Sequence, residues 1–266
     1  WGRTILMVTH DPRISAYADR IGRVLARADE LGMVVIVGLF YAAHVRKMEE
    51  QAVWRAAHNA LEFLESTGWR NLLVEIANEV EIVLDKSGYA MFDPQRTHEM
   101  VDALRLDHSG FLFSTSQRGA NPEEGKGMPP PALVEAVDYV LLHGNGNPAS
   151  RLAAAIETIQ AMPEYRQNPK PILINEDSVG VPNLDVAWPR GVSWGYYDQG
   201  NGCEWKDVYV DTRGQPREGR YEGLSGFQTP PVNWSINTGH KRAFFGRVAE
   251  ITAVRGEGKR REAALS

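Results

Sequence analysis

Two carboxylates at the ends of apolar runs are the residues of this sequence best placed to do chemistry. The run Leu72-Leu-Val-Glu-Ile-Ala-Asn-Glu79 ends in an Asn-Glu pair, and so does the run Pro171-Ile-Leu-Ile-Asn-Glu176. An apolar run with a polar end is typical of a buried parallel strand whose C-terminal end opens onto the rim of a sheet. A lone glutamate of this kind is more often part of a rim salt bridge. The second one, after another Asn, makes us expect Glu79 and Glu176 to face each other across one pocket.

Two facing glutamates can cleave a glycosidic bond. One carboxyl group must be protonated to donate to the leaving oxygen, and the other must be ionised to attack the anomeric carbon. Mutual repulsion raises the pKa of one carboxyl group, which permits this division of roles at neutral pH. Cleavage with retention requires the two groups about 5 to 5.5 Å apart, and we expect that separation here.

Strands and helices alternate along the chain and must position this pair. Apolar β-branched runs predict strands, and apolar residues at helical spacing predict helices. The predicted strands span residues 4–9, 33–40, 71–77, 111–114, 139–142, 172–174 and 192–197. The predicted helices span residues 14–31, 53–64, 94–107, 149–162 and 241–253, and a hairpin is expected near residues 208–210. Such alternation indicates a parallel sheet covered by helices.

The spacing of the strands favours a (β/α)8 TIM barrel. Five units separate the strand openings at Val34 and Val192, at about 32 residues each, and such a barrel needs about 31. One unit before Val34 lies the run at residues 4–9, so we expect strands two to eight of a barrel without the first. That run is alternatively one arm of a hairpin, and a doubly wound sheet is the alternative fold, although its glycine-rich first turn is absent from the sequence.

The barrel hypothesis also sets the domain organisation and the place of the pair. We predict one catalytic domain over residues 1–254 and a basic tail over residues 255–266, in a chain that is truncated at its N-terminus. Glu79 ends the predicted strand four and Glu176 the predicted strand seven, 97 residues or three units apart. These strands lie on opposite sides of the barrel mouth, where the two side chains can reach one bond.

The residues around the pair carry a family resemblance. The string Val74-Glu-Ile-Ala-Asn-Glu79 resembles the acid/base strand of the retaining clan A glycoside hydrolases, especially the cellulase and mannanase family 5, in which Tyr-Glu-Ile-x-Asn-Glu-Pro ends strand four. Residues 171–176 resemble the nucleophile strand of that family, and Ser193-Trp194 resembles its strand eight. The resemblance extends from about Asp19 to Ala253 and implies a retaining O-glycosyl hydrolase on a TIM barrel, without a cofactor.

The resemblance also implies roles for individual residues. They are Glu79 as acid/base, Glu176 as nucleophile, Asn78 as a donor to the sugar 2-hydroxyl and Trp194 as a stacking platform. Tyr41 is the other aromatic residue directly after a strand, where a flat ring suits the C–H face of a sugar.

Three positions depart from the family pattern. Strand three ends Gly38-Leu-Phe40 instead of Asp-Leu-His, and Val80 replaces the Pro after the acid/base. Strand six reads His143-Gly-Asn145 instead of His-x-Tyr, whose Tyr donates to the nucleophile. We expect Asn145 to donate in its place. His143 is either a hydrogen-bonding group of the site or a core histidine.

Neighbouring polar residues have competing interpretations. Glu75 and Glu81 share the side of Glu79 by strand parity. We expect Glu75 in the barrel interior and Glu81 in the loop beyond the strand. Ser114 and Ser116, at the end of another strand, either line the pocket or cap a turn.

Composition limits the partners. A formal net charge of −5 gives no reason to expect nucleic acid, and no apolar stretch approaches the roughly 20 residues of a membrane span. Cys203 is the only cysteine, so the chain can form neither an internal disulfide framework nor a thiolate metal site. The predicted partner is an oligo- or polysaccharide. The chain opens at Trp1 without a signal-peptide pattern, so the sequence does not determine the cellular compartment. A secreted or periplasmic location is compatible with the sequence.

Two other functions compete with the glycosidase hypothesis. A metal-dependent hydrolase on the same barrel would use His10, Asp11, His44 and His143, but adjacency sends the side chains of His10 and Asp11 apart. A non-catalytic sugar-binding descendant is the third possibility, suggested by the lost strand-six Tyr.

Overall fold

The computed structural model describes residues 5–8, 14–198, 233 and 235–263 of the chain. Every predicted strand is present there, although the runs at residues 111–114 and 192–197 shorten to two residues each. The strands are β1 (Ile5–Val8), β2 (Val34–Phe40), β3 (Leu72–Ala77), β4 (Phe113–Ser114), β5 (Val140–His143), β6 (Ile172–Glu176) and β7 (Ser193–Trp194). Counted on the predicted barrel, β3 is strand four and β6 is strand seven.

Helices follow most strands. The longer ones are α1 (Ile14–Glu30), α3 (Glu50–Thr67), α4 (Val80–Ser87), α5 (Thr97–Asp107), α7 (Ala149–Ala161) and α10 (Gly239–Ala263). The shorter ones are α2 (Ala42–Val45), α6 (Pro131–Ala136), α8 (Pro163–Gln167) and α9 (Val181–Ala187), with single 3-10 turns at Ala90–Phe92 and Trp188–Arg190. The hairpin expected near residues 208–210 lies outside the described residues.

The strands pair in parallel and in sequence order, as in a barrel. One sheet has the order β1-β2-β3-β4 and the other the order β5-β6-β7. The inner faces of the two sheets share one apolar cluster, in which Ile36 of β2 packs with Leu141 of β5 and Leu173 of β6. Between the described residues no ladder joins β4 to β5 or β7 to β1. The parallel α/β architecture is therefore confirmed, and full closure of the barrel stays a prediction.

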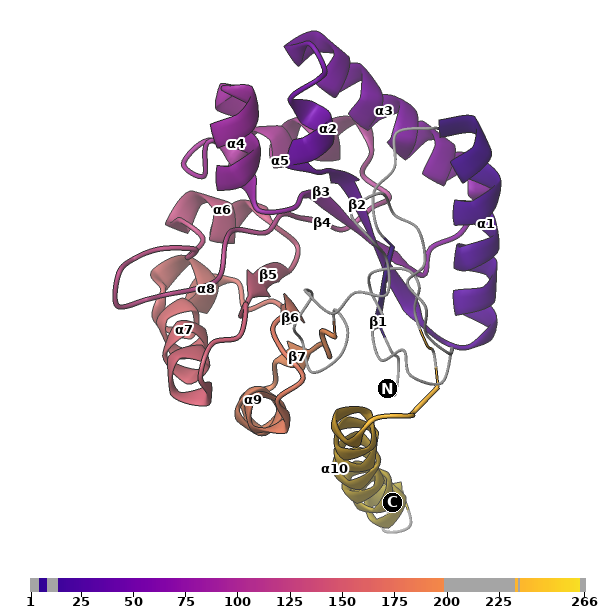
Figure 1. Cartoon of the computed structure of the whole chain (residues 1–266), viewed down its shortest axis with the longest axis vertical. Helices are drawn as coiled ribbons and strands as arrows, with labels where there is room; N and C mark the ends of the chain where they lie inside the picture. Colours follow the sequence, from indigo (N-terminus) through magenta and orange to yellow (C-terminus); the bar gives the residue numbers. More distant parts are fainter. Residues whose placement is uncertain (1–4, 9–13, 199–232, 234, 264–266) are drawn as a thin grey trace, which may run out of the picture.

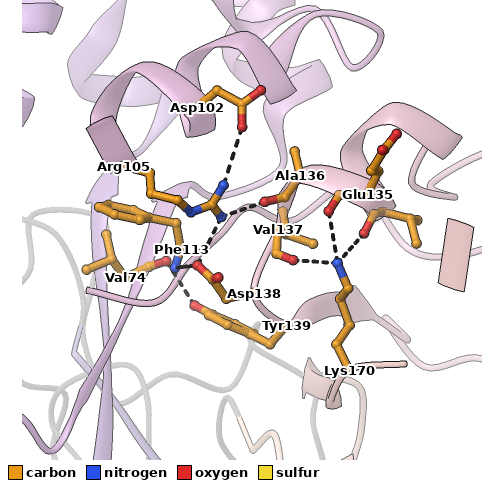
Figure 2. A network of polar contacts seen from close by, with 11 residues as sticks. Val74, Asp102, Arg105, Phe113, Glu135, Ala136, Val137, Asp138, Tyr139 and Lys170 are labelled. Atoms are coloured by element: carbon orange, nitrogen blue, oxygen red, sulfur yellow. Dashed lines mark hydrogen bonds and ion pairs between the residues drawn. The ribbon is translucent and has the colours of Figure 1, made fainter. Parts of the chain in front are cut away.

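Polar contacts bridge β4 and β5, the seam between the two sheets (Figure 2). The Asp138 N–H donates to the Phe113 carbonyl at 2.9 Å, and the Phe113 N–H donates to the Asp138 carboxylate at 2.7 Å. Arg105 also donates to that carboxylate, at 3.0 Å. The Tyr139 hydroxyl donates to the Val74 carbonyl of β3 at 2.9 Å. These contacts replace a regular ladder where β4 has only two residues.

The helices lie outside the strands and bury their outer faces (Figure 1). Apolar side chains of α3, α5 and α7 pack on the strands in the main core, with Leu61, Leu104 and Ile156 fully buried. Helix α10 lies below the other elements in Figure 1, next to α9. No helix of the described part of the chain is long and apolar enough to cross a membrane.

Two expectations need correction. Glu81 belongs to the first turn of α4 and not to a loop, because a helix starts directly after Glu79. The last helix, expected over residues 241–253, spans Gly239–Ala263 as α10 and so extends into the predicted basic tail. The division into domain and tail at residue 254 stays a prediction.

Candidate active site

Glu79 is held at the end of β3 by the chain that follows β4. Its N–H donates to the Ser116 hydroxyl at 3.0 Å, and the next N–H, that of Val80, donates to the Ser116 carbonyl at 3.1 Å. The backbone of Glu79 is left-handed, with φ at 52°. Such a conformation costs a non-glycine residue on the order of 1 to 3 kcal/mol and persists only where its surroundings impose it. Ser116 supplies part of that constraint.

Glu176 is the last residue of β6 and lies beneath the loop that follows β5. The N–H groups of Gly144 and Asn145 both donate to the Glu176 carbonyl, at 2.6 and 3.0 Å. A Cβ atom on Gly144 would lie 2.0 Å from the carboxylate of Asp177, so only glycine fits there. The sequence His143-Gly-Asn145 thus lets β5 and β6 approach closely, which brings its two polar side chains to the glutamates.

His143 lies between the two glutamates and is fully buried. Its Nδ1 is 3.2 Å from Glu79 Oε1 and 3.8 Å from Glu176 Oε2. One oxygen of each glutamate and this nitrogen all lie within 4.8 Å of one another. The side chain of Asn145 donates at 2.9 Å to the same Glu79 oxygen, and not to Glu176 as expected from the family's strand-six Tyr. The predicted residues Glu79, Glu176, His143 and Asn145 therefore form one cluster.

The electrostatics of the cluster separate the two glutamates. Burial favours the neutral form of Glu79, but the hydrogen bond and charge of His143, together with the Asn145 amide, outweigh it and lower the pKa of Glu79. Burial dominates at Glu176 and raises its pKa, with Glu79 adding to the effect. Burial opposes the charged form of His143, yet the hydrogen bond to Glu79 and the surrounding carboxylates raise the pKa of its imidazole. The free site thus favours an ionised Glu79 beside a protonated His143.

Glu75 lies in the interior beneath this cluster, as expected. Its side chain is buried and accepts a hydrogen bond from the Ser116 hydroxyl at 2.6 Å. Burial raises the pKa of Glu75 to about 7, against the opposing charge of His143. Ser116 therefore contacts the side chain of Glu75 and the backbone N–H of Glu79, just before α4, from a fully buried position.

Tyr197 is a residue of the site that sequence reasoning missed. It follows β7, its N–H donates to the Ser178 carbonyl at 3.0 Å, and its side chain forms a hydrogen bond with Glu176. The family's strand-six Tyr, which donates to the nucleophile, is absent here. Tyr197 instead places a tyrosine near Glu176 from the chain after β7. Its place as the last residue of the strand predicted over residues 192–197 was the signal available in the sequence.

The three remaining predicted residues lie at the same rim with different surroundings. Asn78 precedes Glu79 and is buried, and its N–H donates to the Phe40 carbonyl at 3.0 Å. Trp194 is only 9% exposed, since its ring packs against Phe244 and its indole N–H donates to Asp177 at 2.7 Å. Tyr41 is 44% exposed at the end of β2. Of the two aromatic residues, Tyr41 is the more exposed.

A divalent cation would find three donors in the described part of the chain, from Glu79, His143 and Glu176. This set differs from the one predicted from the sequence. His44 lies on α2, where its ring contacts Tyr41, and is not part of the donor group. His10 and Asp11 lie outside the described residues.

Comparison with known proteins gives a consistent result for the fold. No family model matches the sequence, and no curated protein matches it. Solved structures do match, and one is described as an endoglucanase, at 12% identity over 81% of this chain and 82% of that chain, with a TM-score of 0.52. The chain shares its fold with glycoside hydrolases.

Two further structures agree with this result. A structure of fungal β-1,4-galactanases matches at 12% identity over 81% of this chain and 85% of that chain, with a TM-score of 0.52. Thermotoga maritima Cel5A, described in complex with cellobiose, matches at 12% identity over 81% and 83%, with a TM-score of 0.50. The predicted resemblance to the clan A glycoside hydrolases is thereby confirmed at the level of the fold.

Proposed function

We propose that this protein is a glycoside hydrolase that cleaves a β-glycosidic bond with retention, with Glu79 as acid/base and Glu176 as nucleophile. The observation that carries the proposal is the convergence of Glu79 and Glu176, which come from different sheets, on the single side chain of His143. An oxygen–oxygen separation within 4.8 Å supports retention, because inversion needs carboxyl groups about 6.5 to 9.5 Å apart to admit a water molecule.

The reaction requires a proton on the acid at the moment of bond cleavage. In the free site the charge of His143 lowers the pKa of Glu79, which places the proton on the imidazole. Glu79 Oε1 lies 3.2 Å from Nδ1 of His143, within reach of that proton. We infer that the proton moves from His143 to Glu79 when a sugar covers the site and removes water. The charge of the imidazole then no longer lowers the pKa of Glu79, and the protonated Glu79 can donate to the leaving oxygen.

The nucleophile needs the opposite charge state. Burial raises the pKa of Glu176, and the charge of His143 and, to a lesser extent, the hydrogen bond from Tyr197 oppose that rise. In this mechanism Tyr197 stabilises the carboxylate that attacks the anomeric carbon. Water then hydrolyses the glycosyl-enzyme, with Glu79 accepting its proton.

The substrate class follows from the fold relatives and not from the site alone. They are described as an endoglucanase, as galactanases and as a protein in complex with cellobiose. We propose a β-linked oligo- or polysaccharide, bound with Asn78, Asn145, Tyr41 and Trp194 at the rim. This substrate requires neither nucleic acid nor membrane as a partner, and no cofactor takes part in the steps above.

The decisive experiment is a panel of aryl β-glycosides and β-linked polysaccharides, with the anomeric configuration of the first product followed by NMR. Retention is expected, and the Glu79→Gln and Glu176→Gln variants should be inactive on polysaccharides. An inverted first product would contradict the proposal. Sugar binding by wild type and Glu176→Gln alike, with no turnover, would favour the non-catalytic sugar-binding alternative.

The donor group of Glu79, His143 and Glu176 favours one second candidate, a metal-dependent hydrolase. A nitrogen and two carboxylate oxygens within 4.8 Å suit a zinc ion that keeps an open position. Metal content of the purified protein separates the two candidates. A stoichiometric ion whose removal by chelator abolishes hydrolysis would favour the metal-dependent reaction and end the glycosidase proposal.

A further inference from the structure

Ser116 forms hydrogen bonds with residues at the end of β3 and the start of α4, through both its backbone and its hydroxyl group. Its N–H donates to the Ala77 carbonyl at 3.2 Å, and its carbonyl accepts from Val80 at 3.1 Å. Its hydroxyl accepts from the Glu79 N–H at 3.0 Å and donates to Glu75 at 2.6 Å. The side chain is fully buried, so no solvent substitutes for these partners.

The direction of each hydrogen bond is determined by chemistry. A backbone N–H can only donate, so the Ser116 oxygen accepts from Glu79, and its single hydroxyl proton is left for the Glu75 carboxyl group. Glu75 therefore orients the hydroxyl, and the hydroxyl oxygen in turn holds the N–H of Glu79.

That N–H belongs to one of the two non-glycine residues with a positive φ in the described part of the chain. Glu79 has a φ of 52° and starts α4. In the ordinary extended conformation its side chain would leave β3 in a different direction and lose its contacts with His143 and Asn145. The direction of the Glu79 carboxylate thus depends on what holds its backbone.

We propose that Ser116, oriented by buried Glu75, is a positioning residue that holds Glu79 in the left-handed conformation from which its carboxyl group reaches the scissile bond. The inference rests on the proposed function, because it assigns Glu79 the acid/base role. Neither residue touches the substrate. Both act through the backbone of Glu79.

The chain offers a matched control two residues away. Ser114 is also buried, also on the β4 segment and in register with Glu75, but its hydroxyl oxygen has no hydrogen-bond partner among the described residues. Ser114→Ala thus removes the same atom from the same environment without touching Glu79. Ser116→Thr keeps the hydroxyl and tests rescue.

The test compares kcat/KM of the full chain for two aryl β-glycosides of the same sugar. Phenol is a poor leaving group and needs a proton from the acid, whereas 2,4-dinitrophenolate leaves without one. For Ser116→Ala we expect a loss of about 10- to 100-fold with the phenyl glycoside and of less than about 3-fold with the dinitrophenyl glycoside. Ser114→Ala should stay within about 2-fold of wild type on both substrates, and Ser116→Thr should recover most of the loss.

A second pair of variants keeps the proposal testable if Ser116→Ala does not fold. Glu75→Gln keeps a carbonyl oxygen that accepts from Ser116, and Glu75→Met removes the acceptor. The methionine variant should show the larger selective loss on the phenyl glycoside.

Equal losses on both substrates, or equal behaviour of the two alanine variants, would overturn the positioning role and leave the glycosidase proposal standing. A wild-type protein that cleaves neither glycoside nor any polysaccharide would overturn the proposed function itself.

Discussion

The buried carboxyl group of Glu75 makes the stability of the fold depend on pH. Burial raises its pKa to about 7 from the ordinary 4.5, so the native state holds this proton over a range in which the unfolded chain has lost it. The free energy of unfolding therefore falls as pH rises from about 4.5 to about 7. The full difference corresponds to roughly 3 kcal/mol, of which about 2.5 kcal/mol falls between pH 5 and pH 8.

Glu75→Gln isolates this contribution because glutamine resembles the protonated carboxyl group and does not titrate. The free energy of unfolding is measured by urea denaturation at pH 5 and pH 8 for both proteins. We expect the variant to gain about 2.5 kcal/mol relative to wild type between the two pH values. Glu62→Gln, an exposed position on α3, serves as the matched control for loss of one glutamate.

The result that refutes this reasoning is a stability difference between Glu75→Gln and wild type that is the same at both pH values. Glu75 would then be ionised in the native state as readily as in the unfolded one. A gain at pH 5 instead of pH 8 would reverse the sign and contradict the assignment of burial as the dominant cause.

Three further predictions concern the site and the seam. Glu176→Gly should abolish turnover of aryl β-glycosides, and azide should restore it with formation of an azido-sugar of inverted configuration; a variant with full activity would show that Glu176 is not the nucleophile. His143→Asn removes the charge beside Glu79, so the pKa of Glu79 should rise, seen by NMR titration of its carboxyl carbon, and a fall would contradict the proton-holding role. Asp138→Ala should lower the free energy of unfolding, measured in urea, by about 1 to 3 kcal/mol, because it leaves the Phe113 N–H and Arg105 without their acceptor at the seam. The control Asp102→Ala, at an exposed carboxylate that also contacts Arg105, should change it by less than about 1 kcal/mol.

Much of the scaffold is predictable because it depends on local patterns. The run at β2 is apolar on both faces, as a strand between an inner cluster and outer helices must be, and it forms as expected. Glu79 and Glu176 are found from the ends of such runs. The short helix α4 is not, because it follows a left-handed Glu79 whose N–H donates to the hydroxyl of Ser116, and no local pattern in the sequence shows that contact.

The contacts within the site are harder to predict because they join residues far apart in sequence. Ser116 and Glu79 are 37 residues apart, and His143 and Glu79 are 64 apart. A serine after a strand gives no sign of which backbone it will meet. The surroundings of Trp194 follow the same rule, since Asp177 and Phe244 come from other elements and leave little of its ring exposed.

The candidate site lies across the seam between the two sheets, so it is complete only when both sheets are assembled. Glu79 and its supports Ser116 and Glu75 come from the first sheet and the chain after it, while His143 and Glu176 come from the second. Each set is built from consecutive chain, so separate fragments cut between Ser116 and β5 would each carry one glutamate of the pair Glu79 and Glu176. Neither fragment alone has both groups that the reaction needs. Recovery of hydrolysis on mixing would measure how well the two pieces recognise each other, with catalysis as the signal for complementation.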